Sequence, residues 1–292
     1  MARGPLTKIS VATTVNADEA VAALLAEIFG QSASSYTHAD SGRTQASVYL
    51  TRAGDWSASK RRQLVSALDG LREAGMLVGP GRISVRTVQH EDWAESWKRH
   101  FKPFAIGDAL LVKPSWSSRG AKRGQAVLVI DPGLSFGTGQ HPTTRFCLEE
   151  LVLCRPGDGR KTFLDIGIGS GILSIAAAKL GYSKVTGFDH DAEAVRVARA
   201  NARLNQVSRR VHFRCLDLAA LVRGPNRFDV ICANLTWDLL LGQQRRILAQ
   251  LAPGGCLVLA GILHTQFPEV TEAYRAAGLK LKRRQRGGES DG

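Results

Sequence analysis

The stretch LDIGIGSGILSIAAAKLG, residues 164–181, decides the fold of this chain. Together with the preceding KTF, its first residues are apolar enough to form a buried strand, and ILSIAAAKLG has the composition of a helix that ends at Gly181. Gly167, Gly169 and Gly171 lie between the two elements. Because glycine has no Cβ, a ligand can approach the backbone closely at such a turn. The stretch therefore predicts a ligand site where a strand turns into a helix.

Strands and helices continue to alternate through the rest of the C-terminal part. We expect strands at 183–189, 210–217, 227–235, 256–262 and 279–285, and helices at 192–206, 239–252 and 268–278. This alternation predicts an α/β fold with a doubly wound, mostly parallel sheet. In such sheets, ligands bind at the carboxyl ends of the strands.

The N-terminal part has a different pattern, typical of a small α+β domain. We expect helices at 18–30 and 57–75, the second capped by Ser57 or Ser59, and strands at 45–51 and 82–89. An aromatic-rich stretch follows, which we interpret as a linker that packs against both domains. The predicted organisation is residues 1–88 as the α+β domain, 89–126 as the linker and 127–292 as the α/β domain.

Composition excludes several classes of protein. The 292 residues are 44% hydrophobic and 22% charged, which favours folded domains over disorder. No apolar run has the length of a membrane span, and the N-terminus lacks the apolar core of a signal peptide. The five cysteines include no C-x-x-C pair, so we expect free thiols in a reducing cytoplasm and no metal site.

The net charge of +13 is shared by both halves of the chain. Basic clusters such as KLKRRQR at 280–286 are typical of a solvated surface, or of a protein whose partner is acidic or lies near nucleic acid. The aromatic-rich motif of RNA-binding domains is missing, so we expect no sequence-specific nucleic-acid binding. The sequence does not report the oligomeric state, although we favour a monomer.

The spacing of the glycine turn narrows the choice of ligand. Its G-x-G-x-G pattern differs from the G-x-G-x-x-G of dinucleotide sites, and Asp189 follows Gly167 by 22 residues, at the end of the next strand. A carboxylate there can accept hydrogen bonds from both ribose hydroxyls. These features fit a dinucleotide or S-adenosylmethionine. A tight turn followed by a helix-capping Asp is the structural alternative.

Three further polar residues have both a structural and a functional interpretation. Asp217, at the end of the third strand, can face an adenine or cap the next segment. Asn234 ends the apolar strand FDVICA and can hold an amine or simply form a turn; we favour the first. His141 can serve as a general base, but local hydrogen bonding of a His before Pro is the interpretation we favour.

The runs DPGLSFGTGQHPTTRFCLEEL, LDIGIGSGILSIAAAKLG, FDHDAEAVRVARANARLNQV, ANL and LAPGGCLVLAGIL closely resemble the bacterial methyltransferases of large-subunit ribosomal protein eleven. The linker resembles theirs too, and the resemblance extends over roughly residues 90–280. The loop FGTGQHPTT is its most distinctive part. The resemblance implies a Rossmann-like, class I methyltransferase domain that uses S-adenosylmethionine and methylates lysine side chains and an N-terminal amine. It also implies an N-terminal domain that recognises the substrate protein.

The resemblance also assigns roles to individual residues. Thr144 contacts the cofactor, Gly167 and Gly169 lie against it, and Asp189 holds its ribose. Asn234 lines the methyl-transfer pocket and positions the amine. Phe136, in the loop that would fold over the cofactor, helps to exclude water.

The sequence departs from the family pattern at several positions. Gln140 replaces a threonine, Ile168 replaces a cysteine, and the C-terminus lacks a tryptophan. The run Thr236–Trp237–Asp238 after ANL is also unusual, so Trp237 is either a new pocket wall or a surface residue at the start of a helix. Three alternatives therefore remain open: a lysine methyltransferase of another protein, a nicotinamide-dependent dehydrogenase, and a non-catalytic ribosome-associated module.

Overall fold

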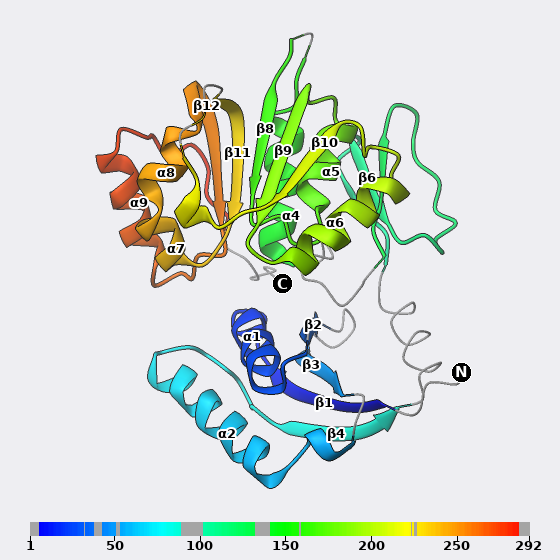
Figure 1. Ribbon diagram of the computed structural model, residues 1–292, viewed down its shortest axis with the longest axis vertical. Helices are drawn as coiled ribbons and strands as arrows, with labels where there is room; N and C mark the ends of the chain where they lie inside the picture. The colour runs from blue at the N-terminus through cyan, green and yellow to red at the C-terminus, as the bar shows by residue number, and fades with distance from the viewer. Residues whose placement is uncertain are drawn as a thin grey trace. The chain divides into compact units, whose positions relative to one another are not determined.

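The computed structural model describes residues 6–31, 33–37, 43–50, 53–88, 102–131, 141–157, 159–222, 224 and 227–285. The chain forms two compact units, which meet in sequence between Phe101 and Lys102 (Figure 1). Among the residues described, the first unit contains one sheet and the second contains two, and each unit has its own buried core. Within the described residues, no helix combines the length and the apolar composition that a membrane crossing requires.

The described residues of the first unit form a four-stranded antiparallel sheet and two α-helices. Its elements are β1 (Leu6–Thr13), α1 (Asp18–Phe29), β2 (Ala33–Thr37), β3 (Thr44–Leu50), α2 (Ala58–Glu73) and β4 (Ile83–Val88). The strand order is β2-β3-β1-β4. Side chains such as Ile9, Val48, Leu25 and Leu64 form its core between sheet and helices. The predicted α+β character is confirmed, and Ser57 is the cap of α2, because its side chain accepts the N–H of Lys60 at 3.2 Å.

The prediction missed β1 and β2. Every second side chain of β1 lies on the sheet face opposite the core, and there Ser10 bonds the Ser47 hydroxyl at 2.8 Å. The serine breaks up the apolar run that would have indicated a strand. The sequence of β2, ASSYT, contains one large side chain, so no apolar alternation marks it.

The second unit begins inside the stretch that the sequence analysis assigns to the linker. Residues from Lys102 onward form β5 (Phe104–Ile106) and β6 (Leu110–Lys113), which join β7 (Ala126–Val129) in a three-stranded sheet. Leu110 and Val112 are fully buried in the core of this unit. This burial explains why 102–126 belongs to the second unit, whereas residues 89–101 lie outside the described ones.

The main sheet of the second unit contains five parallel strands in the order β10-β9-β8-β11-β12. Its elements are α4 (Pro142–Leu153), β8 (Thr162–Ile166), α5 (Ile172–Lys179), β9 (Lys184–Asp189), α6 (Ala192–Leu204), β10 (Val211–Cys215), β11 (Phe228–Asn234), α7 (Trp237–Gly242), α8 (Gln244–Ala249), β12 (Leu251–Ala260) and α9 (Phe267–Ala276).

Two separate apolar clusters cover the two faces of this sheet. One joins the sheet to α4, α5 and α6, and contains Phe163, Val185 and Cys232. The other joins it to α7 and α8, and contains Leu164, Phe188 and Ile231. Neighbouring residues of one strand, such as Phe163 and Leu164, therefore face opposite layers. The predicted doubly wound α/β fold is confirmed (Figure 1).

Two local predictions in this unit were wrong. The helix expected at 239–252 is two short helices, α7 and α8, and β12 begins already at Leu251. The strand expected at 279–285 does not form. Its Arg283 instead donates to Glu150 Oε1 on α4 at 2.6 Å, and Leu281 is 45% exposed. A lysine- and arginine-rich segment has too little apolar surface to bury a further strand.

Candidate functional site

The glycine turn links the carboxyl end of β8 to α5 and is held by backbone bonds. Gly167, Gly169 and Gly171 have φ values of 77°, 49° and 80°, in the left-handed region that favours glycine. The N–H groups of Gly167 and Ile168 both donate to the Phe188 carbonyl of β9, at 3.0 and 3.2 Å. A Cβ on Gly171 would lie 2.9 Å from Ala198 Cβ, so this glycine also allows α6 to pack closely. The turn is therefore fixed by its neighbours.

Asp165 is a buried carboxylate directly beneath this turn. Its Oδ2 accepts the backbone N–H of Ser174 at 3.0 Å and the Ser174 hydroxyl at 2.7 Å, which ties β8 to the first turn of α5. Burial raises the pKa of Asp165 to about 7, the bonds to Ser174 lower it, and the nearby charge of Asp189 raises it. Space beside it comes from Gly187 on β9, where a Cβ would lie 2.5 Å from Ile168 and 3.0 Å from the Ser174 hydroxyl.

Asp189 lies at the carboxyl end of β9 and links that strand to the glycine turn. Its Oδ2 accepts the N–H of Gly169 at 3.0 Å, and its Oδ1 accepts the N–H of Asp191 at 3.1 Å. The residue is 9% exposed. The helix cap at this point is Asp191, whose side chain accepts the N–H of Glu193. Asp189 is therefore not the helix-capping Asp of the structural alternative.

The other half of the site comes from the N-terminus of α4 and the carboxyl end of β11. Asn234 Nδ2 donates to Thr143 Oγ1 at 3.2 Å, and Thr143 Oγ1 lies 2.7 Å from His141 Nδ1. Thr144, the next residue of α4, is 2% exposed. The hydrogen bonds thus join three residues that are up to 93 positions apart in the sequence, and they fix the plane of the Asn234 amide.

Several alternatives of the sequence analysis can now be compared with the structure. His141 is the cap of α4, since its Nδ1 accepts the N–H of Thr143 at 3.2 Å, as expected from its place before Pro142. Asp217 caps the short helix Leu218–Ala220 by accepting the Ala219 N–H at 2.8 Å. Trp237 is half-buried and is the first residue of α7. Phe136 lies outside the described residues.

The residues present fit an adenosyl cofactor. The three glycines, Asp189 and Asn234 all come from the carboxyl end of neighbouring parallel strands, where α/β sheets bind ligands. The glycines of the turn have no side chains, so a ligand can approach their backbone closely. At the end of the next strand, the Asp189 carboxylate has lone pairs that can accept further hydrogen bonds. Among the described residues, no three His, Cys, Asp or Glu side chains gather as a metal site would require.

Sequence reasoning missed Asp165, Ser174, Gly187 and Thr143. A signal existed for Asp165, because it is the charged residue in the otherwise apolar strand TFLDI. Gly187 in KVTGFD was also visible as a glycine inside a strand, which marks a close backbone approach. Thr143 and Ser174 carried no such signal, because their roles depend on contacts across the fold.

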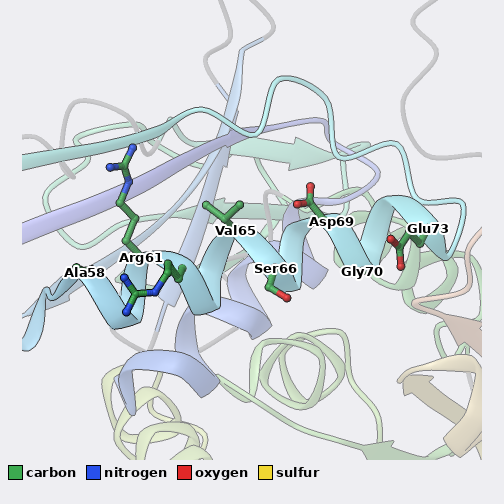
Figure 2. Close-up of a pocket in the computed structure, with 8 residues that line it drawn as sticks. Ala58, Arg61, Val65, Ser66, Asp69, Gly70 and Glu73 are labelled. Atoms are coloured by element: carbon green, nitrogen blue, oxygen red, sulfur yellow. The ribbon is translucent and has the colours of Figure 1, made fainter.

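The first unit has a hollow of its own. It is lined along one side of α2, and Figure 2 shows the labelled side chains spaced along that helix. The lining residues are Ala58, Arg61, Arg62, Val65, Ser66, Asp69, Gly70 and Glu73. None of the predicted cofactor residues belongs to this unit.

Comparisons with known proteins identify the family. The sequence model of ribosomal protein L11 methyltransferases matches residues 5–289. A relative of that name from Geotalea uraniireducens is 43% identical over 212 residues, which are 69% of this chain and 66% of the relative. One from Pelotomaculum thermopropionicum is 40% identical over 236 residues, 80% of this chain and 74% of the relative. The alignments thus cover about two thirds or more of each of these curated relatives.

A solved structure agrees with the sequence relatives. The crystal structure of a ribosomal protein L11 methylase from Lactobacillus delbrueckii subsp. bulgaricus is 28% identical, with a TM-score of 0.58, and it covers 64% of this chain and 94% of its own. The predicted class of enzyme, a methyltransferase, and the predicted methyl donor, S-adenosylmethionine, agree with these relatives. The predicted family is therefore confirmed: the chain belongs to the ribosomal protein L11 methyltransferase family.

Proposed function

We propose that this protein transfers methyl groups from S-adenosylmethionine to amino groups of ribosomal protein L11, on lysine side chains, on the N-terminal amine, or on both. One observation carries the proposal: the Asn234 amide is fixed by Thr143 at the same edge of the sheet as the glycine turn and Asp189. Family membership supports the same activity. Asn234, Gly167 and Asp189 were proposed from the sequence, whereas Thr143 was not.

The cofactor side of the site would be built by five residues. Gly167 and Gly169 would lie against the methionine part, and Asp189 would accept hydrogen bonds from the ribose hydroxyls. Thr144, in the first turn of α4, and Phe136, in the sequence before α4, would also contact the cofactor. When bound, S-adenosylmethionine supplies an electrophilic methyl group on a positively charged sulfur. The protein's task is to hold an amine in line with that bond.

Asn234 would position the amine by accepting a hydrogen bond from one of its N–H groups. A free lysine has a pKa of about 10.4, so only about one in a few thousand is neutral at pH 7. Because Nδ2 of Asn234 is bonded to Thr143, Oδ1 of the same amide is directed elsewhere and can accept an N–H. Desolvation lowers the lysine pKa, and alignment alone can lower the barrier by roughly 7–11 kcal/mol. We therefore assign positioning, and not general-base catalysis, to Asn234.

The first unit would recognise the substrate protein, with residues 1–88 as its recognition domain. The exposed side of α2 supports this assignment, because it combines Arg61 and Arg62 with Val65, a large apolar side chain that is 43% exposed (Figure 2). Reversing both arginine charges (Arg61→Glu with Arg62→Glu) should raise KM for L11 and leave the affinity for S-adenosylhomocysteine unchanged. We place the reaction in the cytoplasm, where ribosomal proteins are made, and expect a monomer that binds no specific nucleic-acid sequence.

Intact-mass spectrometry of ribosomal protein L11 tests the proposal. The L11 of the same organism is incubated with the enzyme and S-adenosylmethionine, with S-adenosylhomocysteine as the negative control. We expect mass increases in steps of one methylene unit. An unchanged mass, measured with an enzyme that still binds S-adenosylhomocysteine, would contradict L11 as the substrate.

One observation favours a second candidate, methylation of lysine in a different protein. Trp237 follows Asn234 by three residues, departs from the family pattern and is half-buried at the start of α7. A changed wall beside the amine would change the accepted substrate. A screen of a cell extract with labelled S-adenosylmethionine, comparing wild type with Trp237→Ala, separates the two candidates.

A further inference from the structure

Two cysteines of the second unit face each other away from the residues assigned to methyl transfer. Cys154 directly follows α4, and Cys256 lies within β12. Their Sγ atoms are 3.6 Å apart, although the residues are 102 positions apart in the sequence. Both side chains are half-buried and pack against the core of the unit. A disulfide requires about 2.0 Å between the sulfurs, so the two Sγ atoms must approach by a further ~1.6 Å to reach bonding distance.

The surroundings of Cys154 favour its thiolate. The hydrogen bond between the two thiols lowers the pKa of Cys154 to about 7, and Lys161 and Lys282 contribute in the same direction, against burial and Glu150. Lys161 is held in place because its Nζ donates to the Cys154 carbonyl at 2.8 Å. The same pairing raises the pKa of Cys256. The Lys161 ammonium thus lies beside Cys154, which favours Cys154 as the attacking thiol.

The remaining cysteines lack this combination. Cys147 and Cys232 are fully buried, so a reagent in solution cannot reach them. Cys215 is exposed, and its Sγ contacts the His190 carbonyl at 3.5 Å. The pair Cys154–Cys256 thus combines partial access, a thiolate and a second sulfur within reach.

We propose that Cys154 and Cys256 form a reversible disulfide when the protein meets a low-molecular-weight disulfide such as oxidised glutathione. The Cys154 thiolate attacks one sulfur of the glutathione disulfide, whose S–S bond breaks and releases one glutathione thiolate. Cys256 then loses its proton to solvent and attacks the Cys154 sulfur, which releases the second glutathione. The protein dithiol is oxidised by two electrons, and the glutathione disulfide is reduced to two thiols.

The new bond would connect two elements that support the candidate site. Thr143 and Thr144 lie at the opposite end of α4 from Cys154. Cys256 pairs in register with Val230 of β11, the strand that ends in Asn234. Oxidation would close a loop that contains β8, β9, β10 and β11, and such a long closed loop makes the folded unit harder to unfold.

Peptide mapping of the full-length protein tests the proposal. Wild type and the single variants Cys154→Ser, Cys256→Ser and Cys215→Ser are incubated with oxidised glutathione, alkylated, digested and analysed by mass spectrometry. We expect a Cys154–Cys256 cross-link in wild type and in Cys215→Ser, and its loss after dithiothreitol. The Cys256→Ser variant should retain glutathione on Cys154, and Cys154 should be alkylated at least ~10-fold faster than Cys256 at pH 7.

Two results would overturn the proposal. One is that Cys154 and Cys256 can both still be alkylated after incubation with oxidised glutathione, while glutathione accumulates on Cys215. The other is that each of the two cysteines carries its own glutathione without any cross-link. Circular dichroism of the serine variants establishes that they are folded, and Cys215→Ser is the matched control for the loss of one thiol.

Discussion

The two sides of the candidate site are built by different kinds of bond. On the cofactor side, Gly167 and Ile168 are held by backbone bonds to Phe188, and Asp189 accepts a backbone N–H of the turn. On the amine side, Asn234, Thr143 and His141 are connected through their side chains. Substitutions on the cofactor side should therefore disturb the turn and cofactor affinity together. Substitutions on the amine side should change the rate and leave affinity intact.

The largest expected effect is on the amine side. Asn234→Ala removes both the N–H that Thr143 accepts and the oxygen proposed to bind the amine. We expect turnover of L11 to fall by roughly 100-fold, within the range seen when one positioned polar group is removed. The dissociation constant for S-adenosylhomocysteine, measured by calorimetry, should change by less than ~3-fold. Turnover equal to wild type would contradict a role of Asn234 in positioning the amine.

The next largest effect is on the cofactor side. Asp189→Ala removes a carboxylate that accepts the Gly169 N–H and is proposed to hold the ribose. Hydrogen bonds to charged groups contribute about 1.5–3 kcal/mol, so the affinity for S-adenosylhomocysteine should fall roughly 10- to 100-fold. Asp191→Ala is the matched control, because it removes a neighbouring carboxylate that only caps α6. Equal losses in both variants would contradict the role of Asp189.

Thr143 allows a more refined test of the amine side. Thr143→Val keeps the shape of the side chain but removes the oxygen that orients Asn234. We expect kcat to fall roughly 10-fold while S-adenosylhomocysteine affinity stays constant, and Thr143→Ser should restore most of the rate. A lower kcat at unchanged S-adenosylhomocysteine affinity distinguishes the loss of this hydrogen bond from general unfolding, which would lower both. If Thr143→Ser were as slow as Thr143→Val, the hydroxyl would not be the operative group.

The smallest effects concern Asp165, beneath the turn. Its pKa is raised from 3.8 to about 7 in the folded protein, so between about pH 4 and 7 the folded state binds a proton that the unfolded chain has released. This residue's contribution to the free energy of unfolding is therefore fully present below pH 4 and is lost as pH rises to about 7. Asp165→Asn should make the free energy of unfolding less dependent on pH between about pH 4 and 7.

A second variant at this position separates charge from hydrogen bonding. Asp165→Ala leaves Ser174 without its acceptor and should lower the free energy of unfolding at pH 7 by roughly 1–3 kcal/mol. Asp165→Asn retains an oxygen and should be closer to wild type. Urea titrations of the three proteins at pH 4.5 and pH 7.5 measure both effects. A pH dependence that is identical in wild type and Asp165→Asn would contradict the raised pKa.

Much of the second unit could be predicted from the sequence, because parallel strands buried on both faces leave continuous apolar runs such as VICA, residues 230–233. The positions of Gly167, Asp189 and Asn234 followed from the ends of those runs. Strand β1 could not be predicted in this way, because Ser10 and Ser47 bond each other on the face opposite the core. A serine paired across a sheet has the same appearance in sequence as a serine in a loop.

The residues that orient the site were harder to predict than those that form it. Thr143 lies 91 positions from Asn234, and only the fold brings them together. The strand predicted around Arg283 was wrong for a related reason. The bond from Arg283 to Glu150 on α4 depends on where the chain runs after α9. Local pattern fixes elements and their ends, whereas contacts between distant side chains depend on the topology that joins those elements.

Cofactor binding and amine positioning should be separable in this enzyme, and one pair of assays decides whether they are. Asp189→Ala and Asn234→Ala are compared with wild type in two assays: calorimetric binding of S-adenosylhomocysteine, and single-turnover methylation of L11 at saturating S-adenosylmethionine. We predict that Asp189→Ala mainly loses affinity and that Asn234→Ala mainly loses rate. If both variants lost affinity and rate to the same extent, the two sides would act as one unit, which would contradict their separation.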